Sequence, residues 1–217
     1  MRPLIKFSIV ECYSAAMHAV IFDIDGTLLK SASVDDELYR SALQRVLGPM
    51  RFRESLSDYD HVSDSGILAQ VIDDNQFSAL QSPAPQIISY FVESLQNYIT
   101  SNGPFLEIPG ARRFLKGLRA SPKHYVALAT GGWRASAILK LESADFDLDG
   151  IGLFTSDQEY DRSRIMLSAL DRPESDYSSI TYYGDGPWDR TACKRLGWKF
   201  VAVGRSLGGL ESYEGHP

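Results

Sequence analysis

Short, continuous runs of apolar residues recur along the chain, and each is followed closely by a glycine. They occupy Ala19–Asp23, Tyr125–Ala129, Ile180–Tyr183 and Lys199–Val203. A run of this length, rich in β-branched and aromatic residues, predicts a strand that is buried on both faces, as in a parallel sheet. We therefore predict a strand at each of these positions.

Between these runs, apolar residues recur at helical spacing. The helical patterns cover Ala111–Ala120, Ala135–Leu141, Arg164–Leu170 and Asp189–Leu196. Strands that alternate with glycine turns and helices are typical of parallel βαβ units. The predicted fold class is α/β, with a Rossmann-like parallel sheet core in a three-layer α/β/α arrangement.

The segment 31–103 contains helical patterns but no buried-strand run. Val34–Leu47 and Gln86–Ile99 are the clearest patterns, and prolines at 83 and 85 precede the second, where a helix tolerates them. Because the segment follows the first strand, it lies at the edge where open α/β sheets bind ligands. The predicted division is a catalytic core of 18–30 and 104–217, an inserted all-helical cap domain of 31–103, and an N-terminal arm of 1–17.

Composition narrows the class of protein. The chain has 217 residues, 44% of them hydrophobic, which is enough to bury a core. Its formal charge of -6 provides no basic field for a nucleic-acid backbone, so we expect no nucleic-acid partner. The sequence contains no uninterrupted apolar run of about 20 residues, which is the length needed to span a bilayer, so no membrane association is expected.

The two cysteines indicate neither a disulfide nor a metal site. Cys12 and Cys193 lie near opposite ends of the chain, which fits neither a disulfide framework nor a zinc site. The cytoplasm is therefore the expected compartment. A secretory signal in the opening residues is a weaker alternative, because its apolar part is short. A monomer is the default expectation, with a dimer left open.

The first predicted strand ends in two carboxylates, Asp23 and Asp25, followed by Gly26. Where the chain turns away at the glycine, both side chains can converge on one ligand, one as nucleophile and one as proton donor or acceptor. An ionised pair beside an apolar core repels, so a divalent cation is the expected partner. An ordinary Asp-Gly turn is the simpler alternative; a calcium loop would need a different glycine spacing.

Two further strand ends carry polar groups. Thr130 and Gly131 stand where a strand turns into a helix, so hydroxyl and N–H donors can bind a phosphate oxygen there; a helix cap is the alternative for Thr130. Asp185 follows Gly184 and offers a hard oxygen ligand for magnesium. Asp189 lies in the first turn of a predicted helix, and we expect it to support the metal ligands without binding the metal directly. The helix dipole alone would also favour an aspartate at this position.

Together these motifs resemble those of the haloacid dehalogenase superfamily, in the phosphoglycolate phosphatase-like branch with a helical cap. Asp23 to Leu28 matches the first motif, Thr130-Gly131 the second, and Gly184-Asp185 through Asp189 the fourth, in the family's order. The resemblance implies Mg²⁺ as cofactor, with Asp23, Asp185 and the backbone carbonyl of Asp25 as metal ligands. It also implies Asp23 as nucleophile and Asp25 as general acid and base.

The third motif of that family is a basic residue, usually lysine. Here Arg162 stands just before the apolar positions of a predicted helix, with Arg164 as the alternative. A guanidinium could pair with Asp23 and bind the phosphoryl group in a bidentate manner. An arginine on a solvated helix face is the plainer interpretation of either residue.

The polar stretch 59–66 in the insertion contains His61, a candidate specificity residue. Capping or turn formation is an equally good interpretation of its neighbours Ser63 and Asp64.

Gly204-Arg205-Ser206-Leu207-Gly208 matches the nucleophile elbow of acyl hydrolases. Too little chain follows it to supply the acid, the histidine and the further strands which that architecture requires.

The predicted function is Mg²⁺-dependent hydrolysis of a small phosphomonoester, phosphoglycolate-like or sugar-phosphate-like, through an aspartyl phosphate. A phosphomutase of the beta-phosphoglucomutase type is the alternative, and a non-catalytic binding protein the second.

Overall fold

A computed structural model describes residues 17–77 and 82–216. The predicted N-terminal arm lies outside these residues except for Met17, which begins the first strand. In the described part of the chain, no helix is long and apolar enough to cross a membrane.

The core of the fold is a five-stranded, wholly parallel sheet with the order β3-β2-β1-β4-β5. Its strands are β1 (Met17–Phe22), β2 (His124–Ala129), β3 (Gly152–Phe154), β4 (Tyr177–Gly184) and β5 (Lys199–Ala202). The strand predictions are confirmed to within a few residues, and β3 is an additional edge strand. It was missed because three residues are too short to show a period.

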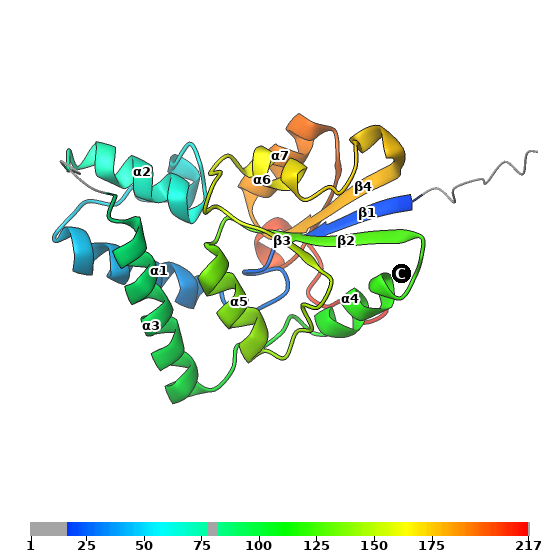
Figure 1. Ribbon diagram of the computed structural model, residues 1–217, viewed down its shortest axis with the longest axis horizontal. Coiled ribbons are helices and arrows are strands. Elements are labelled where there is room, and N and C mark those ends of the chain that lie inside the picture. The colour runs from blue at the N-terminus through cyan, green and yellow to red at the C-terminus, as the bar shows by residue number, and fades with distance from the viewer. Residues whose placement is uncertain (1–16, 78–81, 217) are drawn as a thin grey trace, which may run out of the picture.

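Helices cover both faces of this sheet (Figure 1). On one face, α4 (Ala111–Arg119) and α5 (Arg134–Ser143) pack against residues such as Val20 and Phe22. On the other, α6 (Arg162–Ser168) and α7 (Pro187–Leu196) cover Ile21 and its neighbours. Because alternate residues of β1 face opposite layers, its apolar run is continuous, and the predicted three-layer α/β/α core is confirmed.

The chain between β1 and α4 is helical. It forms α1 (Ala32–Leu47), a 3₁₀ turn at Leu56–Asp58, α2 (Asp64–Asp74) and α3 (Ala84–Asn102), with no strand in its described residues. Helix α2 was not predicted. Its start is marked by Ser63, whose hydroxyl accepts a hydrogen bond from the Gly66 N–H, so the capping interpretation of Ser63 is confirmed.

The insertion packs directly on the sheet domain, with α3 against α5. The Trp133 ring, 1% exposed, lies 5.4 Å from the Tyr39 ring of α1 and 6.3 Å from the Phe91 ring of α3. All three belong to one apolar cluster that also includes Phe22 of β1. The insertion is thereby fixed over the carboxyl end of β2, where Thr130 and Gly131 lie.

Candidate active site

Asp23 follows β1 directly and is anchored by its backbone. Its N–H donates to the Tyr183 carbonyl of β4 at 2.9 Å, and its side chain is buried. The chain then turns at Gly26, which has φ +75°, and a Cβ on this residue would lie 2.0 Å from Oδ2 of Asp185. Only glycine lets the loop after β1 approach the loop after β4 so closely.

These two loops, together with the start of α7, assemble a cluster of carboxylates. Oxygen atoms of Asp23, Asp185 and Asp189 lie within 4.8 Å of one another. Burial raises the pKa of Asp23, and the charges of Asp189 and Asp185 add to this effect, while Arg162 opposes it. Burial, followed by the Asp189 charge, raises the pKa of Asp185 to about 7. Concentrated negative charge on hard oxygen atoms in a buried place is the donor set that Mg²⁺ prefers.

One guanidinium faces this cluster. Arg162 Nη1 lies 3.5 Å from Asp23 Oδ1, and its Nε lies 3.2 Å from Asp189 Oδ1. Both Arg162 Nε and Asp189 Oδ1 are buried without a well-formed hydrogen bond among the described residues. A single arginine therefore compensates only part of the negative charge, which leaves the cluster suited to a cation.

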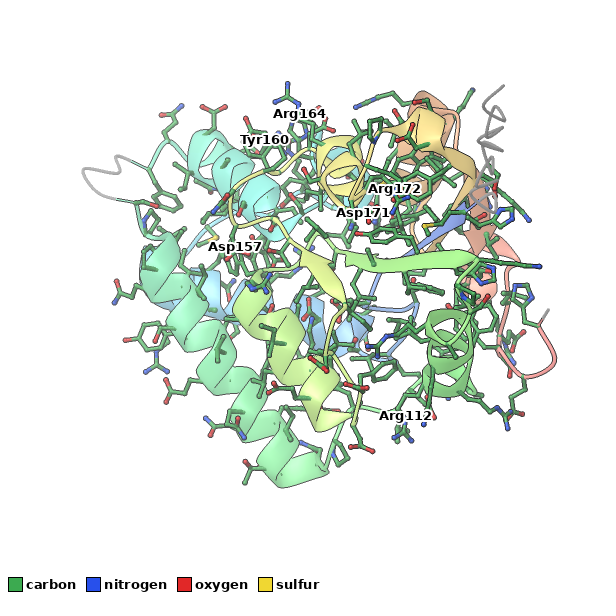
Figure 2. All side chains as sticks on the ribbon, turned by 45° about the vertical axis from the view of Figure 1, so that its right-hand side comes forward. Arg112, Asp157, Tyr160, Arg164, Asp171 and Arg172 are labelled. Atoms are coloured by element: carbon green, nitrogen blue, oxygen red, sulfur yellow. The ribbon has the colours of Figure 1, made fainter. Side chains whose placement is uncertain are left out.

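The alternative basic residue lies elsewhere. Arg164 is 73% exposed, pairs with Glu159 and lies on the outer side of the molecule with Tyr160 (Figure 2). The geometry thus favours Arg162 over Arg164 as the cation that faces Asp23. Helix α6 begins at Arg162 because the carboxylate of Asp161 accepts a hydrogen bond from the Arg164 N–H as its N-cap.

Thr130 and Gly131 border the same space from the end of β2. The Thr130 hydroxyl is buried and accepts from the Gly132 N–H at 3.2 Å. A Cβ on Gly131 would lie 3.0 Å from the Val62 carbonyl and 3.1 Å from Arg162 Nη2. Helix α5 begins later, after Trp133, whose N–H donates to Asp64 at 2.8 Å, so the capping alternative for Thr130 is wrong.

The carboxylate of Asp25 points to different partners. Its two oxygens each lie 2.7 Å from Nζ of Lys140 on α5, and Ser31 donates to one of them. Lys140 also contacts Asp35 of α1. Lys140 was not predicted as a site residue, although a charged residue between Leu139 and Leu141 in a predicted helix is a usable signal.

Core and insertion enclose these groups together. A cavity of about 140 Å³ is bordered by six of the predicted core site residues, though not by Asp189, and by residues of the insertion. From the core these are Asp23, Asp25, Thr130, Gly131, Arg162 and Asp185, and from the insertion they include Tyr39, Val62, Ser63 and Asp64. The strand ends that the sequence analysis singled out therefore meet at one place.

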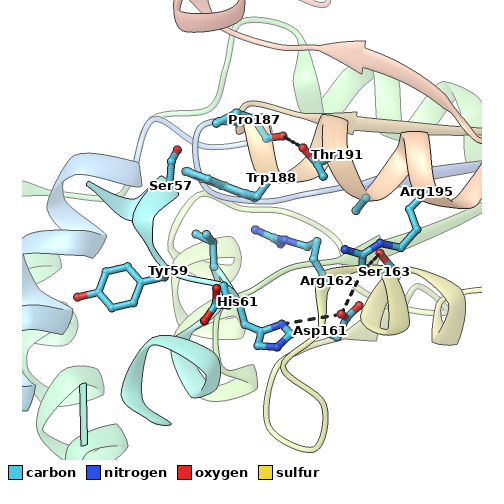
Figure 3. A pocket seen from close by; sticks show the side chains of 13 residues that line it. Ser57, Tyr59, His61, Asp161, Arg162, Ser163, Pro187, Trp188, Thr191 and Arg195 are labelled. Carbon is cyan, nitrogen blue, oxygen red and sulfur yellow. Dashed lines mark hydrogen bonds and ion pairs between the residues drawn. The ribbon is translucent and has the colours of Figure 1, made fainter. Parts of the chain in front are cut away.

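His61 borders a neighbouring cavity of about 230 Å³, which shares Val62, Arg162 and Trp188 with the first (Figure 3). Its Nδ1 lies 3.8 Å from Oδ2 of Asp161, which also binds Arg195. The histidine is thus beside the site and does not border the cavity that contains Asp23. Its predicted part in specificity would have to be exerted through this second cavity.

The chain matches the model of the haloacid dehalogenase-like hydrolases over residues 17–197. It belongs to this family of hydrolases, and the resemblance drawn from its motifs is confirmed. None of the curated proteins searched matches it.

Solved structures with a similar fold include a hydrolase from Pseudomonas syringae, with a TM-score of 0.64, 21% identity, and coverage of 85% of this chain and 83% of that one. CbbY from Rhodobacter sphaeroides in complex with phosphate has a TM-score of 0.65 at 15% identity, with coverage of 90% and 88%. A variant of the same protein in complex with xylulose-(1,5)bisphosphate has a TM-score of 0.65 at 14% identity, with coverage of 91% and 89%. At these identities the likeness concerns the fold.

Proposed function

We propose that this hydrolase is a Mg²⁺-dependent phosphatase that releases phosphate from a small phosphomonoester through an aspartyl phosphate on Asp23. The observation that carries the proposal is the convergence of Asp23, Thr130 and Arg162 on one cavity. A carboxylate nucleophile, a hydroxyl donor and a guanidinium are the groups that phosphoryl transfer needs. The phosphate bound to the similarly folded CbbY supports the same class of ligand.

In the first half of the proposed reaction, an Asp23 oxygen attacks phosphorus while the bond from phosphorus to the leaving oxygen breaks. Arg162 and the donors at Thr130 and Gly131 bind the remaining phosphoryl oxygens. Asp25, in its protonated form, gives its proton to the leaving oxygen, so that an alcohol departs. Asp25 borders the cavity in which the leaving oxygen would lie while its carboxylate contacts Lys140.

In the second half, Asp25 accepts a proton from a water molecule as the water oxygen attacks phosphorus. The bond from phosphorus to Asp23 breaks, which restores the carboxylate and releases inorganic phosphate. Both half-reactions use the same acid/base residue in opposite directions.

We infer that Asp23, Asp185 and the backbone carbonyl of Asp25 would hold Mg²⁺, with Asp189 in support through Arg162. The bound cation would offset the repulsion between the Asp23 carboxylate and the phosphate dianion. The three-carboxylate cluster, in which Arg162 pairs with Asp23 and Asp189, supports this assignment.

We further propose that 31–103 acts as a cap over the core 18–30 and 104–217, and that it selects the substrate. Its residues Tyr39, Val62 and Asp64 border the cavity, which supports this role. The cavity beside Asp23 measures about 140 Å³, so a small phosphorylated metabolite fits this part of the site better than a large one.

The test is phosphate release from 4-nitrophenyl phosphate in Mg²⁺. Asp23→Asn should abolish it, because an amide cannot form the acyl phosphate. Asp145→Asn is the matched control, since this carboxylate is 94% exposed and does not border the cavity. Turnover retained by Asp23→Asn would exclude the covalent route. A sugar-phosphate isomerisation assay run beside it distinguishes a mutase from a phosphatase.

A further inference from the structure

Lys140 lies outside the motifs by which the sequence resembles its family, yet it binds the acid/base candidate. Its Nζ lies 2.7 Å from both carboxylate oxygens of Asp25. It also donates to Asp35, and the side chain has no solvent exposure. The described chain thus has a fully buried ammonium beside the residue that would move protons.

A buried ammonium is costly unless carboxylates compensate it, and an apolar residue would fill the same space more cheaply. Burial lowers the pKa of Lys140, but the charges of Asp25 and Asp35 outweigh this effect and the net shift is upward. The lysine is therefore charged and compensated. Its charge is useful at this position only if those carboxylates have to be held there.

Three separate segments meet at this ammonium. Asp25 lies in the loop after β1, Asp35 in the first turn of α1, and Lys140 near the end of α5. Ser31, the residue before α1, donates to Asp25 from the same loop. The Asp25 carboxylate is thus fixed at the junction of the sheet domain and the helical insertion.

We propose that Lys140 is the positioning residue of Asp25. Its ammonium also binds Asp35, and this second contact fixes the position of α1 relative to the Asp25 carboxylate. This inference rests on the proposed function, because it takes Asp25 to exchange protons with the leaving oxygen and with water. Removing Lys140 takes this anchor from the Asp25 carboxylate at the cavity border, so proton transfer to the leaving oxygen should slow first.

Two substrates separate this role from general damage to the fold. An alkyl phosphate such as glycerol phosphate needs a proton on its leaving oxygen, whereas 4-nitrophenolate leaves without one. Lys140→Met should lower kcat/KM for the alkyl ester by about 10- to 100-fold and for the aryl ester by less than about 3-fold. It should lower kcat for both esters, because Asp25 also activates the water.

Ser31→Ala is a second variant that leaves no buried charge unpaired, and it should show the same selectivity on a smaller scale. Leu141→Val is the matched control, a neighbouring change in the same helix that should leave the ratio of the two kcat/KM values unchanged. Equal losses on both esters in Lys140→Met and in Ser31→Ala would overturn the proposal.

A wild-type chain that hydrolyses neither ester overturns the proposed function instead, and thermal melts then test the lysine without turnover. Asp25→Asn should lower the Tm more in an Asp35→Asn background than in the wild type, because Lys140 then loses its last carboxylate. Equal shifts in the two backgrounds would show that Lys140 does not hold Asp25.

Discussion

The acidic cluster makes an unusual prediction about stability: removing one of its charges should strengthen the fold. Asp185→Asn replaces a carboxylate with a neutral amide of similar shape. One oxygen of this carboxylate lies within 4.8 Å of an oxygen of Asp23 and of an oxygen of Asp189. Without a cation, the wild-type fold bears the repulsion of this cluster and the variant bears less of it.

The size of the effect follows from the pKa of Asp185, which rises from 3.8 to about 7 on folding because of burial and the Asp189 charge. A shift of about 3 units corresponds to about 4 kcal/mol. Coulomb's law gives about 3.5 kcal/mol for two charges at this separation and an effective dielectric constant of about 20, which is the same order.

The sign depends on pH. Above the raised pKa, Asp185 is ionised in both the folded and the unfolded chain, and the fold bears the whole cost. As the pH falls below about 7 the folded chain takes up a proton first, so the cost shrinks and vanishes near pH 4. The Tm of the variant should therefore exceed that of the wild type by about 8 to 16 °C at about pH 8 in EDTA. At about pH 5.5 this Tm difference should be about half as large.

Differential scanning fluorimetry with and without Mg²⁺ measures this directly. Saturating Mg²⁺ at about 100 times its Kd should raise the wild-type Tm by an amount equivalent to about 2.7 kcal/mol and leave the variant nearly unchanged. An Asp185→Asn chain that melts at or below the wild type at about pH 8 in EDTA would refute the electrostatic reasoning.

Two other substitutions test how the loops are built. Gly26→Ala should destabilise the chain by about 1–3 kcal/mol and blunt its Mg²⁺-induced Tm rise, because φ is +75° and the new Cβ would meet Asp185 Oδ2 at 2.0 Å; an unchanged Mg²⁺ response would contradict the close approach of the loops. Ser63→Ala should cost about 1–2 kcal/mol in urea unfolding, because the hydroxyl caps α2 and donates to the Tyr160 carbonyl at 2.9 Å. An unchanged unfolding midpoint would mean that solvent replaces both contacts.

Much of the site could be predicted because parallel strands bring their carboxyl ends to one edge. Asp23, Thr130 and Asp185 each follow a buried apolar run, so their convergence requires only the sheet topology. Choosing Arg162 over Arg164 required the structure. The two arginines are separated by one residue on a short helix, and of the two only Arg162 faces Asp23.

The surroundings of Asp25 could not be predicted in this way. The contact of Asp25 with Lys140 spans 115 residues and depends on the rotation of α5. The contact of Lys140 with Asp35 depends on how the insertion packs on the sheet domain. Helix α2 and strand β3 were missed for a local reason. One follows an irregular polar loop, and the other is three residues long.

The most direct test of the account is to find the phosphoryl group on the enzyme. Asp25→Asn should still be phosphorylated by 4-nitrophenyl phosphate, whose leaving group needs no proton, but should lose water activation, so the intermediate accumulates. Peptide mass spectrometry after acid quenching should then find the mass of one HPO₃ group on Asp23, and none in the Asp23→Asn, Asp25→Asn double variant. Release of nitrophenolate with no phosphoryl group on Asp23, or with the group on another residue, would contradict the account.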